Sequence, residues 1–175
     1  MIILDYGHGE NTKGKRCGEL LEWQFNRNIG RFLELELSSR NIDYHVLVPE
    51  KRDIPLSTRV QRSKNIKHDL LISIHGNAFT SEKVRGVETW YHSQGGKIVA
   101  GIFQRHIIKR TGWVNRGIKK GNFYILKHTP QIAILTENGF YTNDTERLLM
   151  LDEYWQLEIA MAHVDAIQEF LKLKL

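Results

Sequence analysis

Two histidines and one glutamate occupy the same kind of position, just after a short apolar run. His8 follows the apolar residues 1–4 and lies between two glycines, His75 follows residues 70–74, and Glu137 follows residues 132–135. Such runs are typical of strands buried on both faces, and open α/β sheets place their sites where strands end. We therefore expect these three side chains to meet at one sheet edge, where they indicate a metal-assisted hydrolytic site.

Zinc is the metal that these side chains favour. Two imidazoles and a carboxylate with one open position are a common hydrolytic zinc pattern, and zinc requires no redox chemistry. Cys17 is the only cysteine, so neither a cysteine-rich metal site nor an internal disulfide is possible. The third ligand has three candidates, Glu10, Glu19 and Glu22. Glu10 would have to fold its side chain back beside His8, and spacing alone does not choose between Glu19 and Glu22, which can share one helix face.

The segments between these runs alternate between strand-like and helix-like patterns. Helical spacing of apolar residues predicts helices over 20–39, 97–111 and 144–173, the last with a break near Glu153. A short helix through 59–65, capped by Ser57 or Thr58, is expected before the strand at 70–75. Further strands are predicted at 44–48, 86–92 and 122–126. This order predicts an α/β sheet with right-handed crossovers in a single domain over 1–175.

Composition limits the class of protein and its partners. An apolar content of 41% and a charged content of 26% are those of an ordinary globular domain. The net charge of +5 favours an anionic partner, but no nucleic-acid motif accompanies it. The four apolar residues at the start are too few for a signal-peptide core, and no run approaches the roughly 20 apolar residues of a membrane span. We expect synthesis in the cytoplasm without a signal peptide and no membrane partner.

A series of short motifs resembles one known family, the zinc N-acetylmuramoyl-L-alanine amidases of the third amidase family. The motifs occur in the family's order over almost the whole chain: Asp5-Tyr6-Gly7-His8-Gly9, Glu22 with Asn26, Leu56-Ser57-Thr58-Arg59, Ser73-Ile74-His75-Gly76-Asn77, Arg85-Gly86-Val87-Glu88-Thr89, Asn115-Arg116-Gly117 and Glu137-Asn138-Gly139-Phe140-Tyr141-Thr142-Asn143. Tyr6 replaces the family's usual proline and Gly76 its usual alanine. Neither is a ligand position.

This resemblance implies specific roles for the site residues. It implies His8, Glu22 and His75 as zinc ligands, Glu137 as the catalytic carboxylate, and a mixed, mostly parallel sheet with helices on both faces. The implied substrate is bacterial peptidoglycan, cleaved between N-acetylmuramic acid and L-alanine, with the protein acting on the cell wall after release as a phage endolysin or autolysin catalytic domain.

Other residues of the motifs are candidates for supporting roles. Asp5 and Glu88 are candidates to accept a hydrogen bond from the free ring nitrogens of the two histidines. Asn77 and Arg116 are candidates for contact with the substrate.

Two rival interpretations remain open to test. A zinc carboxypeptidase would need a glutamate three residues after His8, where this chain has Asn11. A non-catalytic cell-wall-binding or nucleic-acid-binding module with a vestigial zinc site would not need all four of His8, Glu22, His75 and Glu137.

Overall fold

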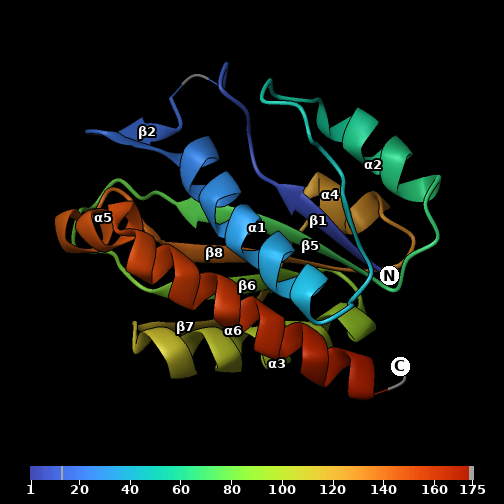
Figure 1. Cartoon of the computed structure of the whole chain (residues 1–175). Helices are drawn as coiled ribbons and strands as arrows, with labels where there is room; N and C mark the ends of the chain where they lie inside the picture. Colours follow the sequence, from blue (N-terminus) through green and yellow to red (C-terminus); the bar gives the residue numbers. More distant parts are fainter. Residues whose placement is uncertain (13, 174–175) are drawn as a thin grey trace.

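A six-stranded sheet forms the centre of the molecule, with strand order β4-β1-β5-β8-β6-β7 (Figure 1). The computed structural model describes residues 1–12 and 14–173, so residues 13, 174 and 175 of the predicted domain lie outside it. Every neighbouring pair in the sheet is parallel except β6 and β8, which are antiparallel. The predicted α/β class with a mixed, mostly parallel sheet is therefore confirmed.

The strands that position the site are the central ones. The six strands of the sheet are β1 (Ile2–Tyr6), β4 (Tyr44–Val46), β5 (Leu70–Asn77), β6 (Val87–Tyr91), β7 (Asn115–Lys120) and β8 (Ile132–Phe140). A separate small hairpin is formed by β2 (Arg16–Cys17) and β3 (Leu20–Leu21). β1, β5 and β8 lie side by side and in parallel, so their carboxyl ends meet at one edge of the sheet.

Helices cover both faces of the sheet (Figure 1). On one face α1 (Glu22–Ser39), α3 (Gln94–Thr111) and α6 (Glu153–Lys172) pack over a large apolar core. On the other face α2 (Leu56–Lys64) and α4 (Tyr124–His128) cover a smaller one. α5 (Asp144–Leu151) follows β8 beyond the sheet edge. Because β1, β5 and β8 bury both faces, their sequences are continuous apolar runs and do not alternate.

Several predicted boundaries are confirmed. The break near Glu153 separates α5 from α6 at Asp152. α3 ends at Gly112, whose φ of 66° is the left-handed conformation that glycine adopts readily at a helix end. The helix predicted over 20–39 begins at Glu22, and this start matters for the site described below.

Two predictions about secondary structure are wrong, and one strand was missed. The predicted strand at 122–126 is in fact the short helix α4, because a short apolar run fits a buried helical turn as well as a strand. Strand β7 was not predicted, because an edge strand with the sequence Asn-Arg-Gly-Ile-Lys-Lys lacks an alternating pattern. α2 begins at Leu56 after Pro55 with no side-chain cap, so neither Ser57 nor Thr58 caps it.

None of the helices in the described part of the chain combines the length and the apolar character needed to span a bilayer.

Candidate metal centre and active-site cleft

Strand pairing brings the two histidines together. His8 lies two residues beyond β1, and Gly7 donates its backbone N–H to Ile74, the residue before His75, at 3.0 Å. The two imidazole rings meet edge to face with centroids 5.0 Å apart. Gly7 is required here because a Cβ at this position would lie 2.1 Å from the His75 ring. β5 continues through His75 to Asn77, two residues beyond the end predicted for this strand.

Glu22 completes a cluster of three possible metal ligands. Its Oε1 lies 3.2 Å from Nε2 of His8 and 3.0 Å from Nδ1 of His75. One ligand atom from each of the three side chains lies within 4.8 Å of the others. Glu22 is the first residue of α1 and is buried, whereas Glu19 and Glu10 are exposed outside the cluster. Tertiary structure thus brings together the triad that the family resemblance implied.

The electrostatics of Glu22 suit a metal ligand. Burial alone would raise its pKa, but hydrogen bonds and charge from His75 and His8 outweigh burial and lower the pKa to about 2. The carboxylate is therefore ionised at any physiological pH. Its second oxygen, Oε2, accepts a hydrogen bond from the hydroxyl of Tyr141 at 3.3 Å, which fixes the orientation of the carboxylate.

Glu137 lies beside this cluster and has no partner for one of its oxygens. In the β5–β8 register it is directly opposite His75, within β8. Its side chain is buried, and Oε2 has no hydrogen-bond partner among the described residues. Burial raises its pKa well above the ordinary value, and the negative charges of Glu22 and Glu88 add to that effect. A buried carboxylate without a partner is costly unless it serves a ligand or a reaction.

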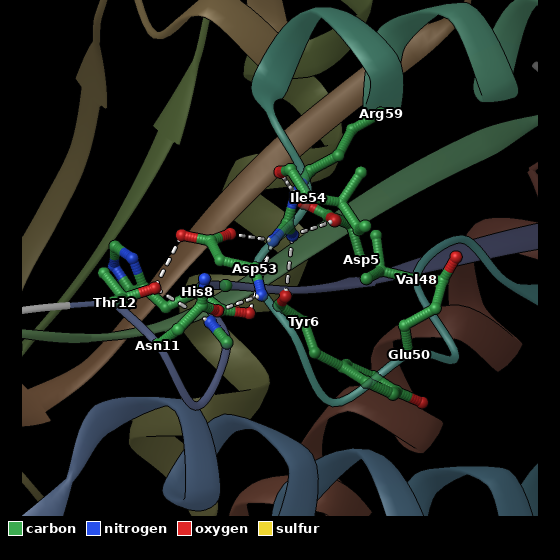
Figure 2. Close-up of polar contacts among 12 residues, drawn as sticks. Asp5, Tyr6, His8, Asn11, Thr12, Val48, Glu50, Asp53, Ile54 and Arg59 are labelled. Carbon is green, nitrogen blue, oxygen red and sulfur yellow. Dashed lines mark hydrogen bonds and ion pairs between the residues drawn. The ribbon is translucent and has the colours of Figure 1, made fainter.

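The loop that carries His8 is held by the guanidinium group of Arg59 (Figure 2). His8 has a φ of 64°, which is rare for residues other than glycine. Arg59 is buried, and its Nη1 donates to Asp5 and to the backbone carbonyl of Tyr6, both at 2.7 Å. Its Nη2 donates to the carbonyl of His8 at 3.3 Å and to Asp53 at 2.9 Å. These contacts hold the unusual backbone of His8 in place.

Asp5 extends this support to the second histidine strand. Its other carboxylate oxygen accepts a 2.7 Å hydrogen bond from Ser73, two residues before His75 on β5. The prediction that Asp5 accepts a hydrogen bond from a metal-site histidine is wrong. The carboxylate instead binds Ser73, which is directly paired with Asp5 in the β1–β5 register, and Arg59, which reaches it from α2.

Glu88 also has partners other than the histidines, so its predicted role as an acceptor for them is wrong. Its Oε1 accepts from Asn77 at 3.0 Å and from the indole of Trp90 at 3.2 Å. Its Oε2 accepts from Arg116 at 2.9 Å and from Lys119. Both cations lie on β7, the strand that was not predicted, and they form ion pairs with the carboxylate of Glu88.

A cleft of about 490 Å³ opens over the cluster and Glu137. Apolar side chains at the starts of α2 and α4 form one wall of it, with Leu56, Phe123 and Tyr124 exposed. Asn77 also lines the cleft. Sequence reasoning missed this wall and Tyr141, although Tyr141 follows Glu137 by four residues within a motif that was recognised.

The fold and the site together define an α/β protein with a potential metal centre and an unpaired acid at one sheet edge. Residues 2–169 match the family described as N-acetylmuramoyl-L-alanine amidase, and the chain belongs to this family. The predicted resemblance is thereby confirmed over nearly the whole chain.

Solved structures of amidases share this fold closely. An N-acetylmuramoyl-L-alanine amidase from Clostridium difficile 630 is 31% identical, with a TM-score of 0.92 over 98% of this chain and 96% of that one. The catalytic domain of the amidase CwlV from Bacillus (Paenibacillus) polymyxa var. colistinus is 28% identical, with a TM-score of 0.92 over 98% and 97%.

Relatives known by sequence include a phage protein and bacterial amidases. The endolysin of Bacillus phage SPP1 is 31% identical over 99% of this chain and 67% of its own length. N-acetylmuramoyl-L-alanine amidase LytC of Bacillus subtilis is 28% identical over 83% of this chain. The chain spans only 30% of the length of LytC and 57% of the probable cell wall amidase LytH of Staphylococcus epidermidis.

Proposed function

We propose that this chain is a zinc-dependent peptidoglycan hydrolase that cleaves the amide between N-acetylmuramic acid and the L-alanine of the stem peptide. The observation that carries the proposal is the cluster of His8, Glu22 and His75 beside the unpaired acid Glu137, in one cleft. Membership of the amidase family supports the choice of bond. The relatives include a phage endolysin and a probable cell wall amidase, which supports action on the cell wall as a phage endolysin or a bacterial autolysin.

The three clustered side chains fit a zinc ion. Two imidazole nitrogens and one carboxylate oxygen converge, the carboxylate is ionised, and the set matches the protein ligands of catalytic zinc sites. Bound there, zinc would act as a Lewis acid and would lower the pKa of a water from 15.7 to about 7.

Glu137 supplies the proton transfers in this proposal. Its buried carboxylate has a free oxygen, and burial raises its pKa above the ordinary value, which makes it a stronger base than an exposed glutamate. It takes a proton from the water that attacks the amide carbonyl. It then gives that proton to the nitrogen of L-alanine as the C–N bond breaks. The products are the carboxylic acid of the lactyl group and a peptide with a free amino terminus.

Glu137 acts in this scheme as the base and not as a fourth ligand. A site closed by four protein ligands would leave no position for water. The other side chains of the cleft orient these groups: Tyr141 orients Glu22, and Arg59 holds the backbone of His8.

The test is to identify the bond that is cut. Purified cell walls incubated with the zinc-loaded protein should release new amino termini that are exclusively alanine, without new reducing sugar ends. A chelator should abolish the release and added zinc should restore it. Release of reducing ends, or of amino termini other than alanine, would overturn the proposed activity. Binding to walls with no release under any metal condition would favour the non-catalytic module.

A further inference from the structure

A row of charged side chains runs across the sheet away from the metal cluster. His75 on β5 is paired with Glu137 on β8, and Glu137 is paired with Glu88 on β6. Directly paired residues project to the same face of a sheet. The pairing of β6 with the next strand, β7, shifts register beside Glu88. Arg116 lies in the part of β7 where the register shifts. The row therefore leads from a proposed zinc ligand, through the proposed base, to a cationic strand.

The end of this row has a surplus of positive charge. The side chain of Glu88 is only 5% exposed, and one of its oxygens accepts from both Arg116 and Lys119. Its other oxygen is occupied by Asn77 and Trp90. One carboxylate thus faces two cations, and the cluster as a whole is positive.

Arg116 is oriented by contacts with Glu88 and Phe140, and part of its guanidinium group is still available. Only its Nε binds Glu88, and its guanidinium lies 4.9 Å from the centre of the Phe140 ring. No hydrogen bond from its two terminal nitrogens is found among residues 1–12 and 14–173. The side chain is 31% exposed, and that of Lys119 is 33% exposed. An oriented planar fork with free donors is the geometry that binds a carboxylate with two parallel hydrogen bonds.

This cationic pair adjoins the cleft at two points. Asn77 lines the cleft and donates to Glu88. Phe123 also lines the cleft, and its ring packs at 5.1 Å against Trp90. Nζ of Lys119 lies 5.4 Å from the centre of the Trp90 ring. Arg116 and Lys119 do not line the cleft themselves, but each contacts a residue, Glu88 or Trp90, that packs against the lining.

We infer that Arg116, together with Lys119, forms a subsite for a carboxylate of the stem peptide, about two residues beyond the scissile amide. Neighbouring strands lie about 4.8 Å apart, so β6, two strands from β5, is about 10 Å from His75. The side chain of Arg116 reaches back to Glu88 on β6. An extended peptide advances about 3.3 Å per residue, so two to three residues cover about 7–10 Å. This inference rests on the proposed function, because it takes the substrate to be a peptide amide.

The experiment compares two soluble muramoyl peptides that differ in one group. One carries a free carboxylate on the second residue of the stem and the other a carboxamide, and kcat and KM are measured for both. We expect the wild-type protein to favour the carboxylate by about tenfold in kcat/KM, from charged hydrogen bonds at a partly exposed site. Arg116→Gln should bring this ratio close to one, chiefly through a higher KM for the carboxylate form. Arg116→Lys, which keeps the charge and loses the fork, should give an intermediate ratio.

The matched control is Arg31→Gln, which removes one exposed positive charge on α1 away from the cleft. It should leave the ratio unchanged. The thermal midpoint of each variant checks that it is folded. A wild-type ratio near one, or a ratio that survives in Arg116→Gln, would overturn the subsite while the proposed function stands. Equal losses on both peptides would make Arg116 a purely structural partner of Glu88 and would also overturn it. Failure to cleave either peptide or whole walls would instead overturn the proposed function, and the subsite with it.

Discussion

Replacement of Glu137 by glutamine distinguishes two roles for this residue, a catalytic base and a purely structural carboxylate. The substitution keeps the size and planarity of the side chain and removes its ability to take a proton. Loss of a general base typically slows a reaction by about 10² to 10⁴, which corresponds to about 2.7–5.4 kcal/mol in the activation barrier. We expect Glu137→Gln to bind zinc and peptidoglycan normally and to turn over at least about a hundredfold more slowly.

The same substitution should stabilise the metal-free protein at neutral pH. Burial raises the pKa of Glu137 above its ordinary 4.5, so the folded state binds more protons than the unfolded state above that pH. The free energy of unfolding of the wild-type protein therefore falls as pH rises through this range, and that of Glu137→Gln has no such loss. The thermal midpoint of the metal-free variant should be higher than that of the wild type at pH 7, with no difference of this origin below about pH 4.5.

The assay measures three quantities on one preparation: zinc per chain, thermal midpoint without metal, and rate of wall lysis per folded molecule. Full zinc with a near wild-type rate would refute Glu137 as the base. A lower midpoint with an unchanged rate per folded molecule would show that Glu137 acts as a structural partner of the loop that follows it.

Three further predictions follow from contacts around the site and in the core. His75→Ala should lose zinc and activity together after dialysis, whereas Glu19→Ala should retain zinc, because only Glu22 lies in the ligand cluster. Arg59→Lys keeps a charge beside Asp5 and loses contacts to the carbonyls of the His8 loop. It should weaken zinc binding about 10- to 100-fold in a competition titration and lower stability by about 1–3 kcal/mol. Burial lowers the pKa of His163 from 6.5 to about 4, so the unfolded state binds more protons between these values and stability falls as pH decreases. Between pH 7.5 and 5 the loss from this group should be about 2 kcal/mol in chemical denaturation, and His163→Gln should lack it.

Each of these has a result that would contradict it. Stoichiometric zinc in His75→Ala, or loss of zinc in Glu19→Ala, would show that the ligand set is wrong. Unchanged zinc affinity in Arg59→Lys would mean that the His8 loop keeps its conformation without the guanidinium. An identical dependence of stability on pH in His163→Gln and the wild type would assign the effect to other groups.

The sequence was sufficient for the fold class and for three of the four central side chains. Continuous apolar runs are produced by strands buried on both faces, and His8, His75 and Glu137 are adjacent to such runs, so their meeting at one edge follows from parallel pairing alone. The local sequence pattern was less informative for β7 and α4. β7 is polar, and the apolar run 122–126 is equally compatible with the helical turn found in α4.

The third metal ligand shows where spacing stops being informative. Glu19 and Glu22 can lie near the same helix face, and the family resemblance alone favoured Glu22. The structure separates them because α1 begins at Glu22, whose side chain enters the buried edge beside β5, while Glu19 stays outside in the preceding hairpin loop.

The partners of the buried charges were decided only by tertiary structure. Asp5 and Glu88 were both candidates to accept hydrogen bonds from the two histidines. Asp5 instead binds Arg59, 54 residues away, and Glu88 binds Arg116 and Lys119, 28 and 31 residues away. Residue types and short spacings determine which chemistry a chain can perform. Which ionised group pairs with which depends on the packing of distant elements, because a buried charge takes the partner that the fold brings within hydrogen-bonding distance.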